Sequence, residues 1–62
     1  MDVTLLLHLE LVDGEHAWWA ESDDVPGFTA AAPTLAELRE RAHAALHDLL
    51  GAEVAIRERL AV

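Results

Sequence analysis

The sequence predicts an α+β domain of two layers, in which three strands, one helix and a fourth strand follow one another and the helix covers one face of the sheet. Three observations lead to this fold class. Positions from Asp2 to Val12 alternate between apolar and mixed residues, which is the period of a half-buried strand. Asp13-Gly14 is a preferred pair for a two-residue hairpin turn. From Leu35 to Leu50, apolar residues recur at the spacing of an amphipathic helix.

The first two strands are expected to form a hairpin whose register places the two tryptophans. The odd-numbered residues from Val3 to Leu11 are all apolar, so this side of the strand should meet the core. A two-residue turn sets His8 opposite Trp19, and paired residues share a face. We therefore expect Trp18 to point into the core, and Trp19 to be exposed on the opposite face beside His8 and Leu6.

A short third strand is expected from Phe28 to Ala32, after a turn at Pro26-Gly27. Thr34 and Glu37 have the spacing of a capping box, with Thr34 as the helix N-cap and Glu37 reaching back to it. Gly51 fits the position just after a helix. The predicted apolar stripe of the helix consists of Leu35, Leu38, Ala42, Ala45, Leu46 and Leu49.

The last segment, from Glu53 to Val62, allows two predictions. It contains good helix formers, which would suit a second short helix. We favour a strand, because apolar residues alternate with others and only Glu58 breaks the alternation. The apolar set is Val54, Ile56, Leu60 and Val62, and the alternating set is Ala55, Arg57, Arg59 and Ala61.

The expected topology is a three-stranded antiparallel meander with the fourth strand at the sheet edge, parallel to the first. The strand order 3-2-1-4 makes the crossover through the helix right-handed, as nearly all such connections are. One helix covers one face of this sheet. The other face is therefore expected to be uncovered within the chain.

Composition limits the classes of function. The 62 residues predict a single domain over 1–62, and a net charge of −8 disfavours direct binding to nucleic acid. Such a charge suits a basic protein partner. Cysteine is absent, which excludes disulfides and fits a cytoplasmic protein. No signal peptide is apparent after Met1, and no apolar run reaches the roughly 18 residues that a membrane span needs.

Two groups of residues are candidates for a catalytic or metal-binding site. Asp23 and Asp24 are adjacent, whereas a two-metal site needs several carboxylates converging on ions about 4 Å apart. His43 and His47 lie one helical turn apart, as zinc ligands can, and Glu40 could join them. We expect a solvated turn and a solvated helix flank, and hence no enzyme, no metal and no cofactor. The alternative is a small metal-dependent hydrolase that uses these residues.

One stretch carries a family resemblance. Trp18-Trp19-Ala20-Glu21-Ser22-Asp23-Asp24-Val25-Pro26-Gly27-Phe28, followed by Thr34-Leu35-Ala36-Glu37-Leu38, resembles the HicB-type antitoxin domain. The resemblance implies a partial RNase H-like βββαβ fold and a role in a type II toxin-antitoxin system. HicB proteins mask HicA toxins, which are small basic proteins that cleave mRNA. They usually add a C-terminal DNA-binding domain, which is not expected here because the sequence ends at Val62.

These observations together predict a non-enzymatic interaction domain that forms a homodimer and binds a HicA-type basic toxin. The uncovered sheet face should provide the contacts, with the acidic loop of one copy pairing with arginines of the other. The alternative is a solitary dimerisation domain without a toxin. The predicted interface residues are Leu6, His8, Trp19, Asp23, Asp24, Arg57 and Arg59.

Overall fold

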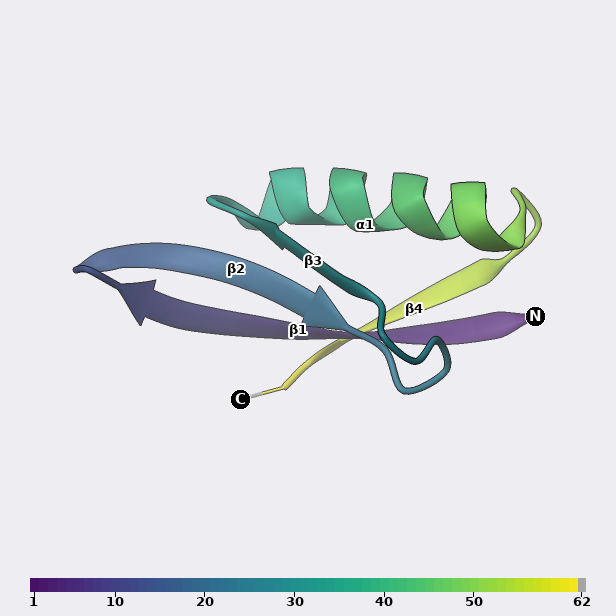
Figure 1. Ribbon diagram of the computed structural model, residues 1–62, viewed down its shortest axis with the longest axis horizontal. Coiled ribbons are helices and arrows are strands. Elements are labelled where there is room, and N and C mark those ends of the chain that lie inside the picture. Colours follow the sequence, from purple (N-terminus) through teal and green to yellow (C-terminus); the bar gives the residue numbers. More distant parts are fainter. Residues whose placement is uncertain (62) are drawn as a thin grey trace.

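The computed structural model describes residues 1–61, which form a four-stranded sheet and one helix (Figure 1). The elements are β1 (Asp2–Val12), β2 (Glu15–Glu21), β3 (Thr29–Ala32), α1 (Leu35–Leu50) and β4 (Ala55–Leu60). The strand order is β3-β2-β1-β4, with β1 antiparallel to β2 and parallel to β4. The predicted fold class, strand order and helix bounds are confirmed.

Two strand boundaries differ from the prediction. β3 begins at Thr29, because Phe28 still belongs to the preceding turn, and β4 is shorter than the predicted segment, whose last residue, Val62, lies outside the described residues. The helical alternative for this last segment is wrong, since β4 pairs with β1 from Asp2 to Leu7. Within residues 1–61, α1 is neither long nor apolar enough to cross a membrane.

The β1–β2 hairpin has the predicted two-residue turn. Asp13 and Gly14 both have positive φ angles, 52° and 79°, as a type I′ turn requires. The resulting register sets Leu9 opposite Trp18 and His8 opposite Trp19. The predicted faces of the two tryptophans follow from this register, and Trp18 packs against the core.

The turn between β2 and β3 brings Phe28 towards the helix. The N–H of Phe28 donates to the carbonyl of Val25 at 3.1 Å, and Gly27 has a φ of 83°. Proline at the second position and a positive-φ glycine at the third define a type II turn. Pro26 and Gly27 therefore reverse the chain direction and allow Phe28 to pack against the core.

Local signals set both ends of α1. The N–H of Glu37 donates to the Thr34 hydroxyl at 3.2 Å, which is the first half of the predicted capping box. The Glu37 carboxylate does not complete the box; it lies 3.8 Å from Arg41, one turn further along the helix. Gly51 ends the helix with a φ of 99°, and its N–H donates to the backbone carbonyl of His47 at 2.8 Å.

The core lies between α1 and the helix-side face of the sheet. It consists of fully or nearly fully buried residues, Val3, Leu5, Leu7, Ala20, Ala32, Leu38, Ala42, Leu46 and Val54. The prediction that Leu9 and Leu11 of β1 meet the core is wrong, because Leu9 is 47% exposed and Leu11 is 70% exposed. The reason is visible in Figure 1, where the hairpin extends past the beginning of α1. In the helix stripe, Ala45 and Leu49 are exposed as well.

Glu58, which interrupts the apolar alternation of β4, joins that strand to the helix. Its two carboxylate oxygens lie 2.8 Å from Arg39 Nε and 3.0 Å from His43 Nε2. His43, predicted on a solvated helix flank, keeps 37% of its side chain exposed and also contacts β4. The contacts with Arg39 and His43 explain why a glutamate interrupts the apolar pattern of β4.

We predict that Glu58→Ala lowers the free energy of unfolding by about 1 kcal/mol, because it leaves Arg39 and His43 without their shared partner. Urea denaturation followed by circular dichroism measures the change. Arg57→Ala is the matched control, since its pair with Asp2 is longer, at 3.7 Å, and both side chains are mostly exposed. That control should change stability by less than about 0.5 kcal/mol. Equal effects of the two substitutions would contradict the role of Glu58.

Candidate protein interface

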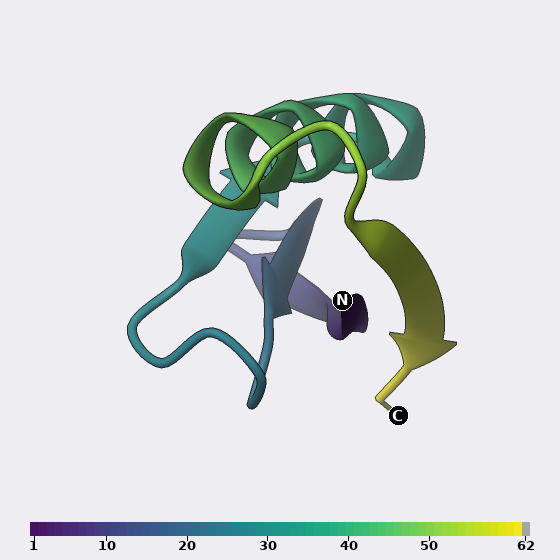
Figure 2. The same ribbon diagram turned by 90° about the vertical axis from the view of Figure 1, so that its right-hand side faces the viewer.

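Within the described residues, one face of the sheet is not covered by another element. Figures 1 and 2 show α1 on one side, and within residues 1–61 no second layer lies on the other side. The strand registers place alternate side chains of β1, β2 and β4 on this open sheet face. Its central residues are Thr4, Leu6, His8, Ala17, Trp19, Glu21, Arg57 and Arg59, and Glu10 lies on the same side opposite Ala17.

An aromatic stack lies at the centre of the open sheet face. The rings of His8 and Trp19, which are cross-strand partners, lie 4.0 Å apart and within 10° of parallel. Nε2 of His8 is 2.7 Å from a Glu21 carboxylate oxygen, a close polar contact that lacks the alignment of a hydrogen bond. Trp19 is thus less exposed than predicted, since the imidazole covers part of its ring. Both rings are held in place before any partner binds.

The indole N–H of Trp19 is enclosed and has no hydrogen-bond partner within residues 1–61. A buried indole N–H normally has one, because leaving a buried donor unpaired is unfavourable by about 1–3 kcal/mol. In the described part of the chain, the stack is therefore the one place on this face where buried polar atoms lack a hydrogen-bond partner.

Leu6 adds an apolar side chain between charged neighbours. It pairs with Glu21 on one side and Arg59 on the other, and it is half-buried. An open groove beside it is lined by Thr4, Leu6, Asp23, Asp24 and Arg59. The structure thus brings four of the seven predicted interface residues into one groove, which carries charges of both signs.

Asp24 also has a structural role. Its carboxylate accepts a 2.9 Å hydrogen bond from the Thr4 N–H, and its own N–H donates to the buried Ser22 hydroxyl at 3.2 Å. The β1–β2 ladder ends at the Leu6–Glu21 pair, so the Thr4 N–H has no backbone partner in β2. The Asp24 carboxylate takes the place of that partner. It thereby fastens the acidic loop to β1.

Arg57 lies at the margin of the open sheet face. It is paired with Thr4 in the β1–β4 register, and its guanidinium is 3.7 Å from Asp2. Both of these charged side chains are mostly exposed. Arg57 therefore contributes positive charge near the first residues of β1, while Arg59 contributes it beside Leu6.

The residues considered for catalysis do not form one site. Asp23 and Asp24 lie at the open sheet face, whereas His43 contacts Glu58 on the helix side. His47 is exposed, with its ring centroid 6.3 Å from that of His43, and Glu40 is exposed on the same helix. Among residues 1–61, no group of three or more His, Cys, Asp or Glu side chains is placed to hold a metal ion.

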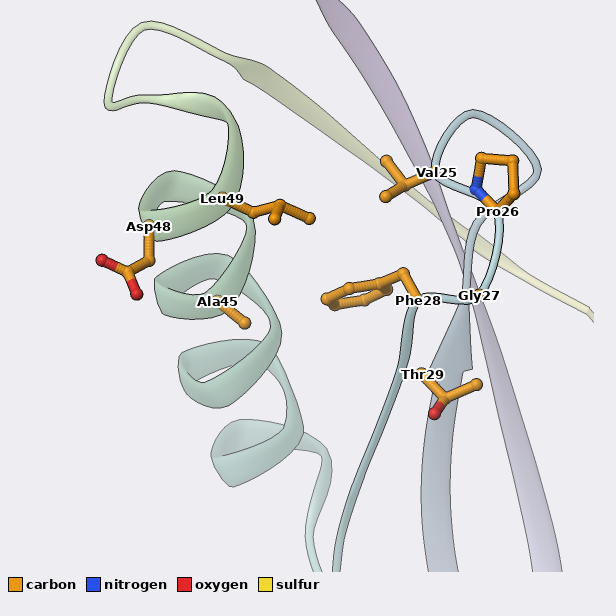
Figure 3. Close-up of a pocket in the computed structure, with 8 residues that line it drawn as sticks. All are labelled: Val25, Pro26, Gly27, Phe28, Thr29, Ala45, Asp48 and Leu49. Carbon is orange, nitrogen blue, oxygen red and sulfur yellow. The ribbon is translucent and has the colours of Figure 1, made fainter.

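A second surface feature is an apolar groove between α1 and the β2–β3 loop (Figure 3). It is lined by Val25, Pro26, Gly27, Phe28, Thr29, Ala45, Asp48 and Leu49. Figure 3 shows Phe28 and Leu49 pointing toward each other, while the Asp48 carboxylate points away. The sequence did not reveal this loop–helix groove, because Leu49 matched the helix stripe. The groove offers apolar contact and no convergent polar groups.

The fold and its surfaces define a small α+β domain with an uncovered, aromatic and charged sheet face. The chain belongs to the family described as a domain of unknown function, DUF1902, whose model matches residues 6–62. That match includes Leu6, the stacked rings, the acidic loop and both arginines of β4. Comparison with curated proteins and with solved structures found no match.

We predict that Asp24→Ala lowers the free energy of unfolding by about 1 kcal/mol, because the Thr4 N–H loses its acceptor. The Thr4 amide should also exchange with deuterium faster, which NMR measures directly. Asp23→Ala removes the same charge from the adjacent position and is the control. If Asp23→Ala destabilises the protein as much, the effect comes from loop charge and not from the bond to Thr4.

Proposed function

We propose that this chain is a HicB-like antitoxin domain: a non-enzymatic, cytoplasmic protein-binding domain that dimerises and neutralises a small basic mRNA-cleaving toxin of the HicA type. The observation that carries the proposal is the open sheet face, where the His8–Trp19 stack lies beside Leu6 within a border of charges of both signs. Large apolar groups on an uncovered face are characteristic of interaction sites.

The stack favours binding because it is already ordered. Association restricts side chains, and each mobile side chain that becomes fixed opposes binding by about 0.5–1.5 kcal/mol. His8 and Trp19 are confined by their contact with each other, and His8 is confined further by its contact with Glu21. They therefore lose little freedom when a partner covers them, and tryptophan is among the residues that contribute most at protein interfaces.

The charges of the open sheet face suit a second copy of the chain. Asp23 and Asp24 carry negative charge on the loop, and Arg57 and Arg59 carry positive charge on β4. A two-fold dimer brings the same patch of each copy together. The arginines of one copy then face the acidic loop of the other, so a single surface supplies both sides of the contact.

The net charge of −8 suits a basic toxin as a further partner. Opposite charges steer two proteins toward each other and discriminate against wrong partners. The Asp24-Val25-Pro26-Gly27 turn and the Thr34-capped helix supply the local part of the resemblance to HicB domains, in the same order along the chain. This likeness in sequence and element order supports the antitoxin role.

We predict that Trp19→Glu abolishes self-association, since a carboxylate at the centre of the open sheet face would be buried without a partner. Light scattering should give a dimer for the natural sequence and a folded monomer for the variant. Leu49→Glu places the same charge on α1, and this control should remain a dimer. A natural protein that is monomeric and folded at all concentrations would overturn the proposed dimer.

We also predict that the chain restores growth to cells expressing a small basic protein encoded beside its gene, and that the two proteins co-purify. Trp19→Glu should reduce both effects, and Leu49→Glu should leave them unchanged. A neighbouring basic protein whose toxicity is unaffected by this chain would remove the antitoxin role. A dimer that lacks such a neighbour would identify a solitary dimerisation domain.

A further inference from the structure

The β1–β2 hairpin projects beyond the rest of the fold as a two-stranded arm, Leu9–Ala17 (Figure 1). The β4 ladder on β1 ends at the Leu7–Leu60 pair, and the β3 ladder on β2 ends at the Trp18–Ala32 pair. Within residues 1–61, the arm therefore has no third strand on either side. Isolated two-stranded ribbons are only marginally stable in water.

The arm presents apolar side chains on the same face of the sheet that α1 covers elsewhere. Leu9 is 47% exposed and Leu11 is 70% exposed. Leu60, the register partner of Leu7, lies on this face as well and is 59% exposed. These three leucines form an apolar shelf next to the core, beyond the reach of the helix.

Within residues 1–61, the backbone of β1 has a free edge beside this shelf. The carbonyl of Leu7 accepts the last bond from the β4 side, from the Ala61 N–H at 2.9 Å. Residues two apart in a strand direct their N–H and C=O groups to the same side, so Leu9 and Leu11 direct theirs to this edge. An exposed edge with unpaired N–H and C=O groups is a template for an added strand.

Charge decides which kind of strand fits. The arm contains Glu10, Asp13 and Glu15 and no lysine or arginine. A second copy that paired through its own arm would bring the same three acids close, and like charges on facing strands are destabilising. A basic segment would be attracted to this edge instead. The arm is thus unlike the open sheet face, which carries charges of both signs.

We propose that the β1 edge at Leu9–Val12 binds an extended basic segment of another protein by strand addition. The added strand alternates apolar residues, which pack on the leucine shelf, with Lys or Arg residues, which face Glu10 on the other side of the sheet. The inference rests on the proposed role as a protein-binding domain. It adds the arm as a second binding surface, distinct from the open sheet face whose contacts with a second copy and a toxin are tested above.

The test uses the full isotope-labelled chain and a capped seven-residue peptide that alternates Arg and Val, observed by NMR. The amide signals of Leu9 to Val12 should shift, and hydrogen exchange should slow at Leu9 and Leu11, whose N–H groups face the free edge. Two control peptides should bind at least tenfold more weakly: one with Glu in place of Arg, and one with alternate amides N-methylated on its pairing edge. The first lacks the charge and the second lacks the backbone donors.

Variants locate the site. The double substitution Leu9→Ser and Leu11→Ser should weaken peptide binding at least tenfold, as should Glu10→Arg, which keeps the shelf intact. Leu49→Ser alters a similarly exposed leucine, at 62%, in the loop–helix groove, and it should bind the peptide normally. Trp19→Glu should also leave peptide binding unchanged, which separates this inference from the dimer and toxin tests.

Three results would overturn the inference. They are the absence of binding by the alternating peptide, shifts confined to the open sheet face, and arm signals that depend on protein concentration without peptide. The last result would assign the edge to a second copy of the chain. None of these outcomes bears on growth rescue or co-purification, so the antitoxin proposal stands or falls by its own experiments.

Discussion

The length of one helix relative to one strand determines much of this structure. A helix of 16 residues such as α1 is about 24 Å long, whereas a strand of 11 residues such as β1 is about 36 Å long. One helix therefore covers one face of the sheet, and only part of it. The projecting hairpin follows from this mismatch, and the uncovered face follows from the presence of a single helix within residues 1–61. The surfaces available to partners are the regions that the chain has no helix to bury.

Two carboxylates stabilise the arrangement in places where apolar packing is thin. Glu58 connects the edge strand β4 to α1 through Arg39 and His43. Asp24 connects the acidic loop to β1 through the Thr4 N–H. In a domain of this size the core is small, and polar contacts of this kind are a substantial part of a marginal stability. They also tie functional candidates to the fold, because Asp24 lines the groove on the open sheet face.

The uncovered surfaces differ in chemistry. The open sheet face combines an ordered aromatic stack with charges of both signs, which suits a second copy of the chain. The arm combines exposed leucines with acids alone, which suits a basic segment. The two surfaces can thus bind different partners.

The sequence alone determined what short-range interactions control. Alternation, the Asp13-Gly14 turn and the Thr34 cap predicted the elements and their order, because each depends on residues within a few positions. The two-residue turn also settled the faces of Trp18 and Trp19, since a hairpin register follows from its turn.

Only the tertiary structure decided what depends on distant residues. Thr4 meets Asp24 and His43 meets Glu58 across 20 and 15 positions of the sequence. The exposure of Leu9 and Leu11 depends on where α1 begins above the sheet, which their own alternation does not contain. Periodicity shows which side of a strand is apolar. Whether that side is covered depends on another element. Because α1 does not cover Leu9 and Leu11, these two leucines form part of a candidate binding edge instead of the core.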